Sequence, residues 1–157
     1  MLITSFQAEM FGTNCWILAT GKSSECVVVD PGMPNVTDQL AEKLDEFNLK
    51  PVATLITHGH LDHTFSVLPV CSGYDIPAMI HSKDRQFLTH PELIHGPQMM
   101  QHLTGLDFQE PEKIVELRDQ ERFNLVGLEF TAIHAPGHTP GSTMFKINNE
   151  VLISGDV

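Results

Sequence analysis

Apolar residues in the first part of the chain form three short runs separated by polar turns. Each run is rich in β-branched or aromatic residues, and turn signals such as Gly-Lys-Ser-Ser and Asp-Pro-Gly bound the runs. This pattern predicts strands over residues 2–6, 14–19 and 26–29.

The spacing of apolar residues then changes to that of a helix. Val36, Leu40, Leu44 and Phe47 recur at helical intervals, which predicts an amphipathic helix over residues 35–48. Residues 52–56 return to a continuous apolar run and predict a strand. Strand, helix and strand together form a βαβ unit, and open α/β sheets place their sites at the carboxyl ends of such strands.

The rest of the chain is less regular. A helical pattern follows His63, and Pro69 is expected to kink or end that helix. Strands are expected over residues 76–80, within 114–133 and over 151–153. Between the first two of these lies a segment, 82–108, that we interpret as a helical, lid-like insertion. Its histidines are expected to lie on exposed helix or loop: His90, His95 and His102.

The most informative stretch is Thr-His-Gly-His-Leu-Asp-His at residues 57–63, directly after a predicted strand. His58 and His60 are two positions apart and point the same way on extended backbone. Asp62 and His63 follow, and Asp62 is a candidate N-cap for the next helix. Three imidazoles and a carboxylate are ligands suited to zinc, iron or manganese rather than calcium or magnesium.

Two later segments repeat the pattern of a strand that ends at a potential ligand. Pro and Gly flank His138 on both sides, which predicts a stiff loop able to hold a ligand in place. The predicted strand 151–153 is followed by Gly155 and Asp156. An Asp after a strand is usually a cap or turn residue, so Asp156 gains weight only as the third member of this series.

Composition narrows the class of protein. The chain has 157 residues, of which 41% are hydrophobic, and we expect one domain over 1–157. The formal net charge of −11 argues against nucleic-acid binding and against anionic membrane surfaces. Two divalent metal ions would add positive charge locally, so an anionic substrate stays open.

Nothing in the sequence indicates a membrane span or a secretory signal. The number of cysteines is odd, no C-x-x-C motif occurs, and free thiols in a reducing cytoplasm are the simplest explanation. We therefore expect a cytoplasmic protein. Two of the three cysteines lie in apolar stretches and are expected to be small core residues, Cys15 and Cys26.

The motifs at 57–63, 135–142 and 154–156, with the early strand and turn at 28–32, resemble those of the metallo-β-lactamase superfamily. The overall pattern is most similar to its glyoxalase II-like branch, the hydroxyacylglutathione hydrolases. The resemblance implies an α/β fold, a metallo-β-lactamase-like αββα sandwich with a dinuclear metal site at one edge. This chain is expected to carry the N-terminal part of that sandwich.

The resemblance also implies a ligand set. The first metal would be bound by His58, His60 and His138, the second by Asp62 and His63, and both by Asp156. The two carboxylates, Asp62 and Asp156, are the expected catalytic groups. Three other candidates are not expected to bind metal: His134 as a strand residue, His81 as a structural residue, and Asp30 as the residue that orders its turn.

One departure from the family pattern affects these expectations. The family continues beyond the Gly-Asp motif to one more His for the second metal, whereas this sequence stops at Val157. We therefore expect a domain truncated at its C-terminus. A mononuclear iron site, as in persulfide dioxygenases, and an incomplete metal-binding or partner-binding remnant without catalysis are the alternatives.

The implied reaction is hydrolysis of a small thioester or related thiol adduct, such as S-lactoylglutathione. A bound metal lowers the pKa of water from near 16 to about 7, so metal-bound hydroxide can attack the carbonyl without a Ser or Cys nucleophile. Zinc is the expected cofactor, as one or two ions, with iron or manganese as alternatives. The sequence leaves open the acyl group, the thiol and the oligomeric state.

Overall fold

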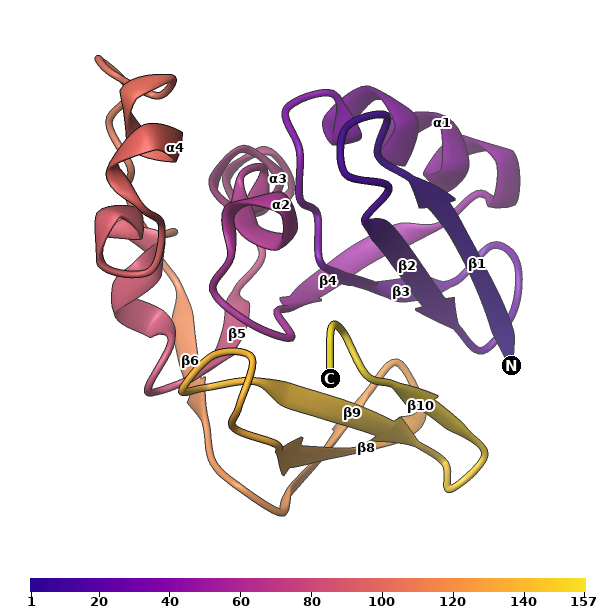
Figure 1. Cartoon of the computed structure of the whole chain (residues 1–157). Coiled ribbons are helices and arrows are strands. Elements are labelled where there is room, and N and C mark those ends of the chain that lie inside the picture. Colours follow the sequence, from indigo (N-terminus) through magenta and orange to yellow (C-terminus); the bar gives the residue numbers. More distant parts are fainter.

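The computed structural model describes residues 1–157 and contains two β-sheets that pack face to face (Figure 1). The strands are β1 (Leu2–Gln7), β2 (Asn14–Ala19), β3 (Glu25–Val29), β4 (Lys50–Leu55), β5 (Ala78–His81), β6 (Ile114–Leu117), β7 (Glu121–Leu125), β8 (Leu128–His134), β9 (Thr143–Ile147) and β10 (Val151–Ile153). The helices are α1 (Val36–Phe47), α2 (Leu61–Thr64), α3 (Val67–Tyr74) and α4 (Pro97–Gln101), with 3-10 turns η1 (Arg85–Leu88) and η2 (Pro91–Leu93).

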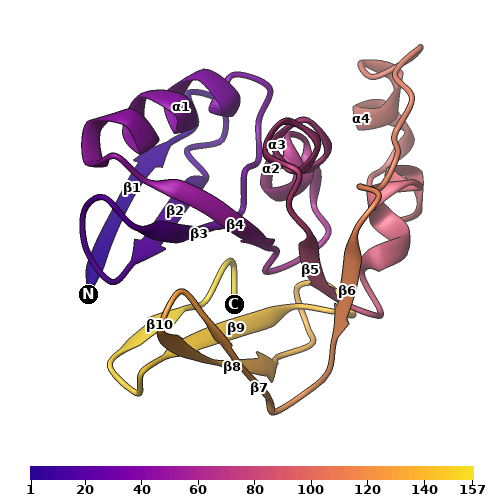
Figure 2. The same cartoon turned by 180° about the vertical axis from the view of Figure 1, so that it is seen from behind.

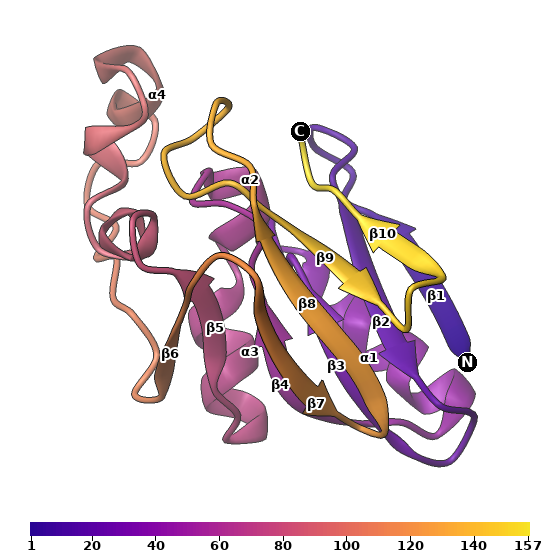
Figure 3. The same ribbon diagram turned by 90° about the horizontal axis from the view of Figure 1, so that it is seen from below.

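The larger sheet has the strand order β1-β2-β3-β4-β5-β6, and the smaller sheet has the order β10-β9-β8-β7. Strands β3 to β6 run parallel, whereas the smaller sheet is antiparallel throughout. Helices α1 and α3 lie on the outer face of the larger sheet, and the smaller sheet covers its inner face (Figures 2 and 3). The predicted βαβ unit is therefore confirmed as β3-α1-β4, and the fold is of the expected α/β class.

Strand β3 is apolar along its run of valines because both faces of its sheet are covered. Val28 points toward the helices and belongs to a buried cluster with Leu40 of α1. Val27 and Val29 point the other way, into a second cluster that includes Phe130 of the smaller sheet. A central strand buried on both faces needs apolar residues at every position, which is why its pattern is continuous rather than alternating.

Three details differ from the sequence expectations. Pro69 does not end a helix but lies in the first turn of α3, where its missing N–H group would have no intrahelical partner, and the expected kink lies ahead of it, at residues 65–66 between α2 and α3. Pro51 lies inside β4 rather than before it, opposite Cys26, where the pairing with β3 is irregular. Strand β9 was not predicted, although Thr143, Phe145 and Ile147 alternate as its buried positions.

The segment between β5 and β6 is confirmed as partly helical, with η1, η2 and α4 standing beside α2 and α3 (Figure 2). Its two ends are joined by Arg85, whose guanidinium donates two hydrogen bonds to Glu110, at 3.0 and 2.7 Å, and one to Glu116 at 3.0 Å. That this segment acts as a lid stays a prediction. The longest helix, α1, has 12 residues, so none of the helices could cross a bilayer.

Candidate metal centre

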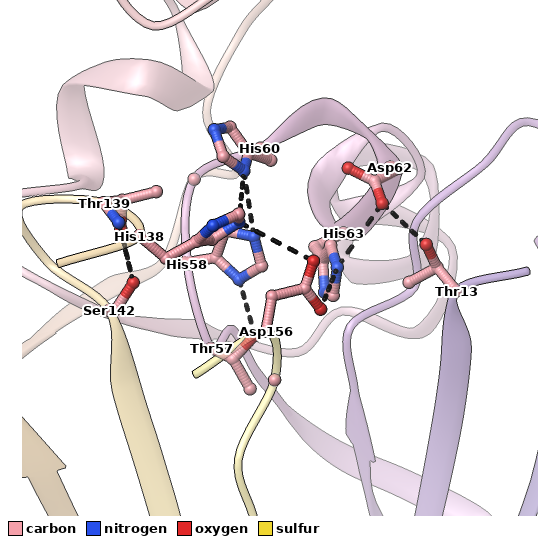
Figure 4. A network of polar contacts seen from close by, with 12 residues as sticks. Thr13, Thr57, His58, His60, Asp62, His63, His138, Thr139, Ser142 and Asp156 are labelled. Atoms are coloured by element: carbon pink, nitrogen blue, oxygen red, sulfur yellow. Dashed lines mark hydrogen bonds and ion pairs between the residues drawn. The ribbon is translucent and has the colours of Figure 1, made fainter. Parts of the chain in front are cut away.

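Three strand ends bring the predicted ligands to one edge of the two sheets. His58 and His60 lie just after β4, and His63 lies in α2, so all three come from the larger sheet. His138 lies in the loop between β8 and β9, and Asp156 lies beyond β10, so these two come from the smaller sheet. Figure 4 shows the five side chains converging.

Three imidazoles form the tightest group. Nδ1 of His60 lies 3.1 Å from Nε2 of His58 and 2.8 Å from Nε2 of His138. Around a tetrahedral zinc ion with Zn–N bonds of 2.0–2.1 Å, the nitrogens would be about 3.3 Å apart. The spacing of these three ring nitrogens therefore fits a single transition-metal ion held between them.

The electrostatic environment favours the neutral form of His58 and His60, the form that binds a metal. Burial, with the neighbouring imidazoles of His63, His60 and His138, lowers the pKa of His58 to about 2. Burial and His138 also lower the pKa of His60. A neutral imidazole presents a free lone pair to a metal ion, and the ring nitrogens of His58, His60 and His138 that face one another have no protein partner that satisfies all three.

A second group of potential ligands lies beside the first. Nε2 of His63 is 3.4 Å from Oδ2 of Asp62 and 3.4 Å from Oδ1 of Asp156. The other oxygen of Asp156 is 3.6 Å from Nε2 of His138. Asp156 therefore lies between the two groups, which is the position required of a bridging carboxylate (Figure 4).

Asp30 lies behind the site and holds two of the imidazoles in place. Its Oδ2 accepts hydrogen bonds from the Thr57 hydroxyl, at 2.6 Å, and from Nδ1 of His63, at 2.9 Å. The Thr57 oxygen in turn lies 3.1 Å from Nδ1 of His58. Burial opposes protonation of His63, but the hydrogen bond and charge of Asp30, with Asp62 and Asp156, raise its pKa. These two imidazoles, His58 and His63, thus turn Nε2 toward the site.

Asp62 is not the N-cap that the sequence predicted. Helix α2 begins at Leu61 with His60 as its N-cap residue, and no side chain of that residue caps it. The carboxylate of Asp62 instead accepts a hydrogen bond of 2.7 Å from the Thr13 hydroxyl in the loop between β1 and β2. Because the helix starts two residues earlier than predicted, Asp62 lies in its first turn and faces the site.

The expectation that His95 lies on exposed helix or loop was wrong, because its side chain is half-buried against the start of α2. The backbone N–H of Leu61 donates a hydrogen bond of 3.1 Å to Nε2 of His95, and the His95 ring lies 5.2 Å from the His60 ring. His95 therefore caps α2 from outside, whereas His90 and His102 are exposed as expected. No sequence signal marks His95, because only the path of the segment between β5 and β6 brings it to the helix.

His81 and His134 form a separate pair away from the ligands. Their rings stack with centroids 4.1 Å apart and an angle of 8° between the planes. His81 lies in β5 and His134 in β8, so the pair connects the two sheets. Burial, with His134 and Lys83, lowers the pKa of His81. Both positions agree with the expectation of structural rather than ligand roles, which stays a prediction.

Comparison with known proteins places the chain in a family. The family model described as the metallo-beta-lactamase superfamily matches residues 8–157. An uncharacterized protein of Mycobacterium leprae is 42% identical over 159 residues, covering 99% of this chain and 72% of the relative. The hydroxyacylglutathione hydrolase GloC of Haemophilus influenzae is 27% identical over 160 residues, covering 100% of this chain and 72% of that protein.

Solved structures agree with this assignment. The structure of BLEG-1, a B3 metallo-beta-lactamase, matches with a TM-score of 0.79 and 28% identity, covering 98% of this chain and 71% of that one. The structure of TTHA1623 in a di-iron-bound form matches with a TM-score of 0.75 and 25% identity, covering 98% and 72%. This chain therefore spans somewhat less than three quarters of each of these proteins.

Proposed function

The chain belongs to the metallo-β-lactamase superfamily, and from that premise we propose that it is a metal-dependent hydrolase that cleaves a small thioester. The observation that carries the proposal is Asp156, which lies between the His58, His60 and His138 group and His63. Similarity to the hydroxyacylglutathione hydrolase GloC supports a thioester as the substrate class.

In this proposal His58, His60 and His138 hold one metal ion, Asp62 and His63 hold a second, and Asp156 contacts both. Zinc is the proposed metal because neutral imidazoles and carboxylates are its common ligands. The di-iron form of TTHA1623 supports iron as the alternative. When bound, such ions lower the pKa of water, polarise a carbonyl and stabilise a leaving thiolate.

The protein's own contribution is to fix which nitrogen of His63 and of His58 faces the metals. Nδ1–H of His63 donates to Asp30, which leaves Nε2 free toward Asp62 and Asp156. Nδ1–H of His58 donates to Thr57, whose hydroxyl donates onward to Asp30. One buried carboxylate thus orients ligands of both groups, and such outer partners strengthen metal binding.

A cysteine nucleophile does not fit the structure. All three cysteines are buried: Cys15, Cys26 and Cys71. Burial raises the pKa of Cys26 to about 12 and that of Cys71 to about 11, so neither offers a thiolate at neutral pH. In this proposal the nucleophile for hydrolysis therefore comes from the metal site and not from a thiol.

The test is to purify the protein from metal-supplemented medium, measure zinc, iron and manganese, and assay S-lactoylglutathione. We expect at least one equivalent of metal and hydrolysis that a chelator abolishes. Nitrocefin and glutathione persulfide, with oxygen uptake for the latter, serve as competing substrates. Less than about a tenth of an equivalent of total metal would contradict the site, whereas turnover of only a competing substrate would contradict the thioester.

A further inference from the structure

Asp84 is a fully buried carboxylate that the ligand pattern does not include. It lies between β5 and η1, far in sequence from every proposed ligand, and its exposed fraction is 0%. Its Oδ2 accepts hydrogen bonds from the backbone N–H of Gly59, at 2.8 Å, and from the Thr139 hydroxyl, at 2.6 Å. Its Oδ1 accepts one from the backbone N–H of Gly141, at 2.6 Å.

These three donors belong to the two loops that carry the first group of imidazoles. Gly59 separates His58 from His60, and Thr139 directly follows His138. Asp84 is therefore a clamp between a loop of the larger sheet and a loop of the smaller sheet. It makes no hydrogen bond to an imidazole, so its influence on the site would act through the positions of these two loops.

Glycines allow both loops to approach the turn at Asp84 and Phe87 this closely. A Cβ atom at Gly141 would lie 2.6 Å from Cγ of Asp84, and one at Gly59 would lie 2.7 Å from Cδ2 of Phe87. Both distances are shorter than carbon atoms can approach without displacement. The turn is thus a shared surface against which both loops are held.

The donors around Asp84 are all neutral groups. No Lys or Arg contacts it, so the cost of burying the carboxylate is offset by two peptide N–H groups and one hydroxyl. Loss of any one of these donors would leave a buried carboxylate oxygen without a hydrogen-bond partner, which costs free energy. Both loops are therefore tied to Asp84 with little freedom to separate.

We propose that Asp84 is a positioning residue that fixes the separation of His60 and His138 and thereby sets the metal affinity of the first group. The proposal rests on the metal site proposed above, and it deepens that site by adding the element that aligns it. The contact it fixes is the 2.8 Å approach of Nδ1 of His60 to Nε2 of His138.

The test compares Asp84→Asn with Asp45→Asn, a charge-matched change on the exposed surface of α1. An Asn amide cannot accept from both peptide N–H groups and the hydroxyl as the carboxylate does. We expect zinc affinity, measured by competition with a chromophoric chelator, to fall about 10- to 100-fold for Asp84→Asn. The visible spectrum of the cobalt-substituted protein should change as well, and Asp45→Asn should match the unmodified protein in both.

A purely structural role predicts a different result. In that case Asp84→Asn lowers the melting temperature of the metal-free protein but leaves zinc affinity and the cobalt spectrum unchanged, and the proposal is overturned. If Asp84→Asn does not fold, Thr139→Val and Thr139→Ser decide instead. The serine variant keeps the hydroxyl and should retain affinity, whereas the valine variant should lose it; equal affinities would contradict the clamp.

These measurements use no substrate, so they are independent of the proposed reaction. A protein that binds zinc and depends on Asp84 for it, but does not hydrolyse a thioester, would refute the function and support this inference. Thioester hydrolysis by the unmodified protein, with unchanged zinc affinity in Asp84→Asn, would support the proposed function and refute this inference.

Discussion

At the scale of single residues, the site depends on which atoms of each side chain are already in use. Asp30 has both oxygens engaged by Thr57 and His63, so it orients ligands rather than offering itself as one. Asp156 has no hydrogen-bond donor of this kind and lies only near imidazole nitrogens. The difference assigns the two carboxylates to different tasks.

Substitution of Asp156 tests its proposed bridge. Asp156→Ala removes the one carboxylate that lies between the two groups, so we expect turnover of S-lactoylglutathione to fall at least about 100-fold, the scale of losing charge stabilisation in a transition state. Glu150→Ala, on an exposed turn before β10, is the control and should keep full turnover. Steady-state kinetics with near wild-type turnover in Asp156→Ala would refute the bridge.

We expect His81 to make the stability of the protein depend on pH. Its pKa is lowered, first by burial and then by His134 and Lys83, while Asp84 and Asp119 oppose this shift. A base whose folded pKa is depressed stays neutral while the unfolded chain takes up a proton. Stability is therefore lost as the pH falls below the ordinary histidine pKa of about 6.5.

The variant His81→Gln lacks this titration. Chemical unfolding at pH 7.5 and pH 5.5 should show that the stability gap between wild type and His81→Gln narrows at the lower pH, because only the wild type loses the contribution. His90→Gln, an exposed histidine, provides the baseline. A gap that stays constant or widens would show that burial of His81 does not depress its pKa.

The roles of residues that stand together in a motif could be predicted from the sequence, and the roles of isolated residues could not. The potential ligands from His58 to His63 stand together after one strand, and Pro and Gly mark the loop of His138, so local sequence was enough to select them. Asp84 and His95 are single residues in segments without periodicity. Their roles arise from contacts with distant loops, and no local pattern encodes these.

At the scale of elements, the strands and helix with strong apolar patterns were predictable, and the short or mixed ones were not. Helix α1 buries one face, which leaves a helical period in the sequence, and strand β3 is buried on both faces, which leaves a continuous apolar run. Strand β9 follows a Pro- and Gly-rich loop and contains Thr and Lys, so its alternation is faint. Helix α2 has four residues, too short for a period, and its start depends on His95.

The hydrogen bond from the Leu61 N–H to His95 offers a test of what holds the start of α2. Removing the His95 ring in His95→Ala leaves the Leu61 N–H without a protein acceptor, so we expect a loss of about 1 kcal/mol in the free energy of unfolding of the metal-free protein. His90→Ala removes only an exposed ion pair with Glu92 and should change the free energy of unfolding by less than about 0.5 kcal/mol. Equal losses in urea denaturation would show that His95 does not support the helix.

At the scale of the whole molecule, the proposed metal site lies where the two sheets meet. Its ligands follow β4 on one side and β8 and β10 on the other, while the apolar cluster around Phe130 and Phe145 joins the sheets from within. A bound ion would therefore connect the layers at their edge. The net charge of −11 makes added positive charge at that edge favourable as well.

Metal removal should consequently lower global stability. A ligand that binds only the folded state at 100 times its Kd contributes about 2.7 kcal/mol, which for a domain of this size raises Tm by roughly 5–11 °C. We expect differential scanning calorimetry to show such a decrease after chelation and full recovery with added zinc. The double variant His58→Ala/His138→Ala lacks two ligands of the first ion, one from each layer, so zinc should raise its Tm by clearly less than it raises that of the wild type. If the wild type melts identically with and without a saturating excess of zinc, the ions do not connect the two sheets and the proposed centre is wrong.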